Sequence, residues 1–372
     1  MGSVSKRIRD GKQSWVVRWR EPDGTQRKKS FTLKRDADRH LALVDASIVT
    51  GDYVTPTSGK ATVGEWAAVW LDATADLKPS TRARYEQLVR KHVVPRWGTV
   101  PLSKVTHDGV GAWVGQLVRD GYAPGTVRQA YRVLSLVLSH AVRSRRLTRN
   151  VAEGVGLPRA TRATPRFLTM PEVRALAAAA GDDGVVVLVL SMTGARFGEV
   201  VALRVGRVDH VRRRLTIAES ASEVGGVIEW GTPKTHAVRT VPFPRSLAEP
   251  LAVACVGKGS DDLVFTSPEG GALRLGNWRR RVFDPACKAA GITDLTPHDL
   301  RHTAASLAIA SGASVKDVQR MLGHASAAMT LDVYAGLYDD GLDDVADRLD
   351  GLAPPERPGG PDEIENVALP GL

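Results

Sequence analysis

The stretch Thr296-Pro297-His298-Asp299-Leu300-Arg301-His302-Thr303 is the most informative part of this sequence. His298 and Arg301 lie three positions apart, so a helix places them on one face. We expect His302 to point elsewhere and to serve as a packing or supporting residue. The positions that follow are mainly apolar and include Ala304, Ala305, Leu307 and Ala308. The stretch therefore predicts a buried helix whose polar end carries two phosphate-seeking groups.

A second motif, Thr193-Gly194-Ala195-Arg196-Phe197-Gly198-Glu199, lies upstream. Its glycine permits a turn that delivers Arg196 to the start of a helix running through Val200, Val201 and Leu203. An arginine there can present its planar fork to phosphate oxygens beside the positive helix end. Such turns are common, and the motif gains meaning only from its neighbours.

A third motif surrounds Lys234. Thr232-Pro233-Lys234-Thr235 lies between the strand-like runs 227–230 and 238–241. This pattern predicts a β-hairpin with the lysine near its tip. Taken alone, such a lysine is more often a solvated turn residue.

The fourth motif ends at a tyrosine. Leu322-Gly323-His324 is followed by Ser326, which can cap a short helix ending near Tyr334. A lone tyrosine in that position is more often a packing residue.

Together the four motifs supply two guanidinium groups, two imidazoles, a lysine and a phenol. No phosphate-binding Walker loop, acidic metal cluster or glycine-rich nucleotide cradle accompanies them, and the histidines lack partners at zinc spacing. Phosphodiester transfer without a metal requires cations around the transition state, a protein nucleophile and a general acid. The set meets these needs, so we expect neither metal, ATP nor another cofactor.

Length and composition indicate a multidomain globular protein. A chain of 372 residues favours two or three domains, and 43% of its residues are hydrophobic. No run approaches the about 18 apolar residues of a membrane span, and the basic start of the chain lacks the apolar core of a secretory signal. Cys255 and Cys287 have no metal-ligand spacing and are expected to be structural thiols. We expect a cytoplasmic protein without membrane partners.

Charge is distributed unevenly along the chain. The net charge is +10, but residues 339–372 contain ten acidic and two basic side chains. Residues 1–338 therefore hold 49 basic against 31 acidic side chains, a balance of +18. Such an excess favours a polyanionic partner, because cations placed on phosphates release condensed counterions. A highly charged protein without such a partner is the alternative.

Four segments follow from the local patterns. Residues 1–55 predict a small β-sheet with a helix, because 14–20 and 27–31 resemble strands around a turn and Leu41, Val44 and Ile48 recur at helical spacing. This segment is expected to contact DNA, a structural cap being the alternative. Residues 62–157 predict a helical domain that begins with a capping box at Thr62 and Glu65.

The boundaries of the helical domain's elements also follow from sequence. One helix is expected to be capped by Ser80 and to run toward Val93, stopping before Pro95. Further helices are expected over about 108–119 and about 124–146.

The largest segment, residues 165–350, predicts a mixed α+β domain that opens with a capping box at Thr169 and Glu172. Strands are expected at 215–218 and 238–241. A helix over 338–352 carries Leu342, Val345 and Leu349 and is expected to dock on a neighbouring protomer, packing in cis being the alternative. Residues 351–372 are rich in Pro, Gly and acidic residues and predict a flexible tail.

In order and spacing, the motifs resemble those of the tyrosine recombinase (phage integrase) family. Its pattern comprises an arginine in a Thr-Gly-x-Arg box, a hairpin lysine, His-x-x-Arg, Leu-Gly-His and a tyrosine shortly afterwards. The matching positions are Arg196, Lys234, His298, Arg301, His324 and Tyr334. The resemblance implies a mainly α, multidomain fold with small β elements, in which 62–157 is a SAM-like helical core-binding domain and 1–55 resembles the arm-binding domain of many integrases.

The resemblance also implies roles. Tyr334 would attack the scissile phosphate to form a 3′-phosphotyrosyl link, and Arg196 and Arg301 would hold the non-bridging oxygens. Lys234 would protonate the leaving 5′-oxygen. His298 would act as acid or base, accepting the tyrosine proton, and His324 would stabilise the transition state by hydrogen bonding. Glu199 matches a position that often holds an acidic supporting residue.

Family resemblance further implies partners and a cellular site. They are double-stranded DNA with core-type and arm-type attachment sites, a homotetramer on that DNA, an excision factor and a host DNA-bending protein. The expected location is the cytoplasm, in association with the nucleoid.

Three other functions share parts of this pattern. A recombinase that resolves chromosome dimers has the same chemistry but usually lacks the basic N-terminal domain. A type IB topoisomerase has a similar site, and the Leu-Gly-His box disfavours it. A catalytically silent DNA-binding regulator has no reason to retain the nucleophile.

Overall fold

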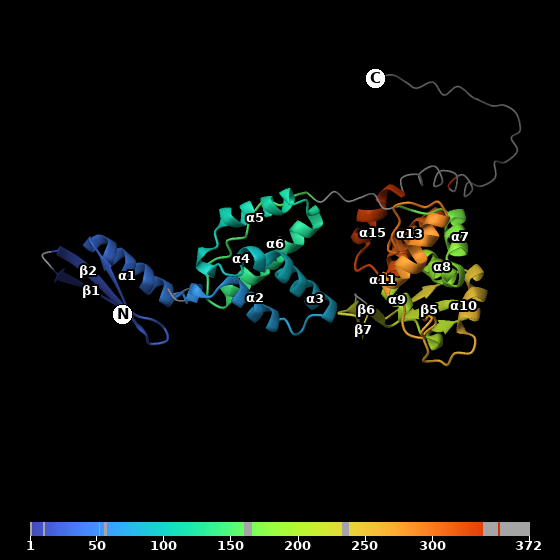
Figure 1. Cartoon of the computed structure of the whole chain (residues 1–372), viewed down its shortest axis with the longest axis horizontal. Coiled ribbons are helices and arrows are strands. Elements are labelled where there is room, and N and C mark those ends of the chain that lie inside the picture. Colours follow the sequence, from blue (N-terminus) through green and yellow to red (C-terminus); the bar gives the residue numbers. More distant parts are fainter. Residues whose placement is uncertain are drawn as a thin grey trace, which may run out of the picture. The chain divides into compact units, whose positions relative to one another are not determined.

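The computed structural model describes residues 2–9, 12–51, 53–55, 58–159, 166–232, 238–337 and 349. The chain forms two compact units, Met1–Ala163 with Val224–Val227 and Thr164–Glu223 with Ile228–Leu372. Figure 1 traces the elements in chain order from blue to red. The predicted fold class, mainly helical with small sheets, is confirmed.

The chain begins with an antiparallel sheet in the order β1-β2-β3, formed by Ser3–Arg9, Lys12–Arg20 and Gln26–Phe31. Helix α1 (Lys34–Val49) covers one face, where Val17 and Trp19 are buried with Ala37 and Val44. The expected strands and helix are confirmed. Strand β1 was not predicted, because its residues become a strand by pairing along β2.

The other face of this sheet is basic. Side chains alternate between the two faces of a strand, so Val17 on the helix face places Arg18 on the opposite one. The register sets Arg18 opposite Lys28 and Arg7 opposite Ser14, which puts Arg7 and Lys28 on the same open face. All three cations are exposed.

A helical body follows, built from α2 (Val63–Asp72), α3 (Pro79–Leu88), α4 (Val94–Trp97), α5 (His107–Arg119) and α6 (Pro124–Arg143). Its core contains four tryptophans, namely Trp66, Trp70, Trp97 and Trp113. The predicted capping box is present: Thr62 accepts from the Glu65 amide at 3.2 Å, and Glu65 accepts from the Thr62 amide at 2.8 Å.

Two predicted boundaries of α3 are wrong. The helix begins at Pro79 after Lys78, and Ser80 does not cap it. The helical path also does not stop before Pro95, because a π-helical turn over Val89–Val93 leads directly into α4. Pro95 lies in the first turn of α4, directly after the π-helical turn.

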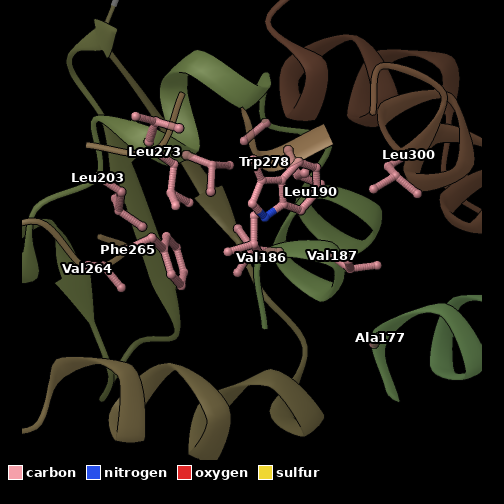
Figure 2. Packing of buried hydrophobic residues seen from close by; sticks show 14 of the residues in the cluster. Ala177, Val186, Val187, Leu190, Leu203, Val264, Phe265, Leu273, Trp278 and Leu300 are labelled. Carbon is pink, nitrogen blue, oxygen red and sulfur yellow. The ribbon is translucent and has the colours of Figure 1, made fainter. Parts of the chain in front are cut away.

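The second unit contains a helical layer and two small sheets. Helix α8 (Gly184–Thr193) contacts both α7 (Met170–Ala179) and α13 (Asp299–Ala310). Figure 2 shows Trp278 within this core, with Val186 and Leu190 of α8 drawn around it. The remaining helices are α9 (Phe197–Val201), α10 (Ala248–Cys255), α11 (Leu275–Trp278), α12 (Asp284–Ala289), α14 (Val315–Leu322) and α15 (Ala327–Tyr334).

The predicted hairpin between 227–230 and 238–241 is wrong. Strand β7 (Val227–Gly231) pairs with β6 (Ser220–Val224), whereas β8 (Arg239–Pro242) joins a separate sheet ordered β4-β5-β8. The other strands of that sheet are β4 (Val208–Asp209) and β5 (Arg214–Ile217).

Local geometry explains this pairing. Gly225 and Gly226 both have positive φ, which suits the two-residue turn of a tight β6-β7 hairpin. Strand β8 instead pairs with β5, where Val241 and Leu215 are opposite each other and fully buried.

Within the described part of the chain, no helix is both long and apolar enough to traverse a bilayer. The predicted helix over 338–352 and the predicted tail over 351–372 lie outside the described residues, apart from Leu349.

Candidate active site

Arg196 reaches the site through a glycine turn. Helix α8 ends at Gly194, whose φ is +64°, and Arg196 then caps the start of α9. A Cβ at Gly194 would lie 2.6 Å from Cδ2 of Leu322, so this close passage requires glycine. The predicted delivery of Arg196 to a helix start is confirmed.

Glu199 connects two arginines. Its carboxylate accepts from Nη1 of Arg196 at 3.0 Å and from both terminal nitrogens of Arg239 at 2.9 and 2.6 Å. Burial acts to raise the pKa of Glu199, but the hydrogen bonds and charge of Arg239, with Arg196 behind them, hold the pKa below its ordinary value. Glu199 is therefore a buried anion that fixes both cations.

Arg239 was not among the predicted site residues. Its side chain is 10% exposed and passes over Gly323, where a Cβ would lie 2.9 Å from Cδ of Arg239. In the sequence, Arg239 simply follows the Lys234 motif, and only the fold brings its strand to Gly323.

Arg301 is enclosed by backbone. Its side chain lies on α13, the residue is 3% exposed, and its terminal nitrogens donate to the carbonyls of Gly194 and Leu322. These carbonyls belong to the ends of α8 and α14, so one guanidinium ties three helices together. Burial, with the nearby charge of Arg196, lowers the pKa of Arg301 to about 9, which leaves it charged at neutral pH.

Tyr334 closes the site from α15. The residue is 1% exposed and packs with Ala305, Val318 and Leu322. Its hydroxyl hydrogen-bonds Nδ1 of His302 at 2.7 Å. Burial raises the pKa of Tyr334 to about 12, although the charge of Arg301 acts in the opposite direction. Ser326 caps α15 as predicted, by accepting from the Met329 amide at 3.4 Å.

The prediction that His302 points elsewhere is wrong. Its ring meets the ring of His298 edge-on, with centroids 5.1 Å apart, and it contacts Tyr334 directly. The signal was available, because positions 298 and 302 are four apart and share a helix face. Burial lowers the pKa of both imidazoles, with a further contribution of His302 to the lowered pKa of His298.

His324 follows the left-handed glycine that ends α14. Its Nδ1 hydrogen-bonds Oγ1 of Thr330 at 3.0 Å, which leaves Nε2 as the second polar atom of the ring. Burial, followed by the charges of Arg301 and Arg196, lowers the pKa of His324 to about 4. The imidazole is therefore neutral at pH 7.

Lys234 lies outside the described residues, in the connection between β7 and β8. The other five predicted residues, Arg196, His298, Arg301, His324 and Tyr334, are linked by the contacts and charges above. Within the described ranges there is no group of three or more His, Cys, Asp or Glu side chains arranged to hold a metal ion. Clustered guanidinium groups, neutral imidazoles and one phenol suit an anionic phosphodiester.

Two family models match the chain. Residues 166–340 match the one described as "Phage integrase family", and residues 62–118 match "Phage integrase, N-terminal SAM-like domain".

The individual proteins to which the chain is similar are integrases and tyrosine recombinases. The integrase of Mycobacterium phage D29 is 28% identical over 319 residues, covering 82% of this chain and 84% of that protein. The tyrosine recombinase XerC of Corynebacterium efficiens is 29% identical over 243 residues, covering 61% of this chain and 73% of that protein. The Tn1549 transposon integrase, solved in complex with transposon right end DNA, matches with a TM-score of 0.68 at 21% identity, covering 78% of this chain and 99% of that one.

Proposed function

The chain belongs to the phage integrase family of tyrosine recombinases, and we propose that it integrates and excises a phage or other mobile element. It is a site-specific recombinase, an enzyme that cleaves and rejoins DNA strands. The observation that carries the proposal is the phenol of Tyr334, held beside the cations of the site by a hydrogen bond to a neutral imidazole.

The chemical roles follow from the residue types and their positions. Tyr334 attacks the scissile phosphorus, its oxygen forms the new P–O bond, and the bond to the 5′-oxygen breaks. Arg196 and Arg301 neutralise the non-bridging oxygens, and the burial of Arg301 strengthens its part of that interaction. His324 donates a hydrogen bond through Nε2 while Thr330 holds Nδ1.

Proton transfer completes the step. Lys234 gives its proton to the leaving 5′-oxygen, and the family resemblance assigns the proton of Tyr334 to His298. The phosphotyrosyl link preserves the energy of the broken phosphodiester, and a second 5′-hydroxyl reverses the attack. The cycle therefore conserves phosphodiester bonds and consumes no ATP.

Residues 1–55 constitute the arm-type DNA-binding domain in this proposal. Arg7, Arg18 and Lys28 stand exposed on the sheet face opposite α1. A small sheet with a basic open face has the size and charge to enter a DNA groove and contact phosphates.

Residues 62–157 bind the core-type site, and residues 165–350 cleave it. Four subunits hold two core sites, and an excision factor and a host DNA-bending protein set the direction. The segment 338–352 docks on the neighbouring subunit in this assembly. The enzyme acts on nucleoid DNA in the cytoplasm.

The alternative function, a recombinase that resolves chromosome dimers, receives less support. The match to XerC covers 61% of the chain, whereas the match to the D29 integrase covers 82%. The longer match favours an integrase with additional N-terminal sequence.

A nicked duplex tests the proposal. It carries the junction sequence found beside the gene, with the nick placed so that cleavage releases a short fragment and prevents religation. The wild type is expected to migrate with DNA on a denaturing gel, and Tyr334→Phe is not. DNA binding by both proteins without covalent attachment by either would support the silent regulator instead.

A further inference from the structure

His302 occupies the position from which the nucleophile can be deprotonated. Its Nδ1 lies 2.7 Å from the hydroxyl oxygen of Tyr334, within the about 2.6–3.2 Å that direct proton transfer requires. The described residues provide this hydroxyl with no second side-chain hydrogen bond. His298, to which family resemblance assigns the proton, instead packs edge-on against the His302 ring, with ring centroids 5.1 Å apart.

The hydrogen bond fits a neutral imidazole that accepts from the phenol. When the phenol donates to Nδ1, that nitrogen carries no proton, and the ring is neutral with its hydrogen on Nε2. Burial lowers the pKa of His302 and raises the pKa of Tyr334 to about 12, and both changes favour this arrangement before reaction.

The backbone holds His302 in place. It lies in the first turn of α13, next to Arg301, whose guanidinium is held by the carbonyls of Gly194 and Leu322. Arg301, the proposed phosphate ligand, and His302, the contact of the phenol, therefore share one rigid turn.

We propose that His302 is a further catalytic residue, the direct proton acceptor of Tyr334, and this inference rests on the recombinase function proposed above. As the phenolic oxygen bonds to phosphorus, its O–H bond breaks and the proton passes to Nδ1 of His302. The ring becomes an imidazolium, and the electron pair of the P–O bond leaves with the 5′-oxygen. In the rejoining step His302 returns the proton to Tyr334.

His298 acts behind this pair as a positioning residue. Its ring packs edge-on against the His302 ring and limits rotation of that ring. The two imidazoles also interact electrostatically, because His302 contributes to the lowered pKa of His298. The titratable and charged groups around His302 are Tyr334 on α15, His298 at the head of α13, Asp299 and Arg301 on α13, and His324 after α14.

The test compares His302→Asn with the wild type on the nicked junction duplex. Asparagine retains an acceptor oxygen near the position of Nδ1 but cannot take a proton at these pH values. We expect the single-turnover rate of covalent attachment to fall about a hundred-fold or more, the usual range for losing a general base. His210→Asn, an exposed histidine in the same unit, is the matched control and should react at the wild-type rate.

Two further measurements separate deprotonation from a structural role. Replacing the bridging 5′-oxygen by sulfur gives a leaving group that needs no protonation, so the His302→Asn defect should persist on that substrate. The wild-type rate should fall as the pH drops through the pKa of His302, which lies below 6.5. The variant should lack this inflection. Because the pH profile is measured on the wild type, it tests the inference even if the variant does not fold.

The outcomes are distinct. A wild-type rate in His302→Asn, a faster rate, or full rescue by the sulfur substrate would overturn the inference, since each means that His302 does not deprotonate the nucleophile. If the wild type binds the duplex but never attaches to it, the proposed function fails instead. Thermal unfolding and DNA binding of each variant, measured in parallel, confirm that the compared proteins are folded.

Discussion

At the scale of single residues, the site combines buried cations with neutral imidazoles. Arg301 keeps its charge because two backbone carbonyls accept from it, whereas the imidazoles of His298, His302 and His324 are held neutral by burial. Neutral rings can accept or donate single protons beside a phosphate without adding further repulsion among the arginines.

This arrangement predicts how stability depends on pH. The pKa of His324 is about 4 in the folded protein and 6.5 when unfolded, so the unfolded state binds more protons between these values. The contribution of His324 to the free energy of unfolding should therefore be complete above pH 6.5, and stability should decline as the pH falls toward 4.

Urea unfolding at several pH values measures this decline. His324→Asn should flatten the decline, whereas His210→Asn, at an exposed position, should leave it unchanged. An identical slope in His324→Asn and the wild type would contradict the assignment of this shift to His324.

At the scale of elements, turns and one ion triad decide where the site residues meet. Gly194 ends α8, Gly323 ends α14, and both adopt positive φ. The carbonyl of Gly194 also accepts from Arg301, so the turn that presents Arg196 also anchors the second arginine.

Gly194→Ala should lower both stability and strand cleavage. The substitution combines left-handed strain of about 1–2 kcal/mol with a contact of 2.6 Å to Leu322. Gly270→Ala has a comparable φ of +82° with nothing within 4 Å, so it should show the strain alone. Chemical denaturation compares the two, and equal losses would mean that the close passage at Gly194 is unimportant.

Breaking the buried Glu199–Arg239 ion pair should lower the free energy of unfolding far more than breaking an exposed ion pair. The two side chains are 1% and 10% exposed, and breaking a buried pair costs about 3–5 kcal/mol. Arg239→Met should therefore destabilise the protein strongly and displace Arg196 through Glu199. Arg279→Met breaks a pair that is 50% and 49% exposed and should cost about 0–1 kcal/mol. Denaturation midpoints with unchanged m-values distinguish the two variants.

At the scale of the whole molecule, the chain has separate apolar cores, and in the proposed function they divide DNA binding from strand cleavage. The four-tryptophan core of the helical body and the α7-α8-α13 layer are independent apolar cores. The N-terminal sheet has a third, smaller core and offers its basic face to solvent.

Charge removal on that sheet should weaken arm-site binding without changing cleavage. Arg18→Gln and Lys28→Gln should each reduce the slope of log affinity against log salt by about one, because each lost phosphate contact retains its counterion. Arg39→Gln, exposed on α1 away from that face, should leave the slope unchanged. Gel-shift titrations over a range of salt concentrations decide between these results.

The sequence by itself determined the residue types of the site and most local elements. Capping residues at Thr62, Thr169 and Ser326, and glycine at Gly194, act over a few positions, so their effects are visible in the chain. The i,i+4 spacing of His298 and His302 also carried a local signal.

Tertiary structure alone decided the partners across long distances. The pairing of β8 with β5 instead of β7, the passage of Arg239 over Gly323, and the hydrogen bond from Tyr334 to His302 join segments far apart in sequence. Such contacts depend on which buried faces fill the shared core, and many arrangements satisfy the same local preferences. Packing of the complete chain selects one of them.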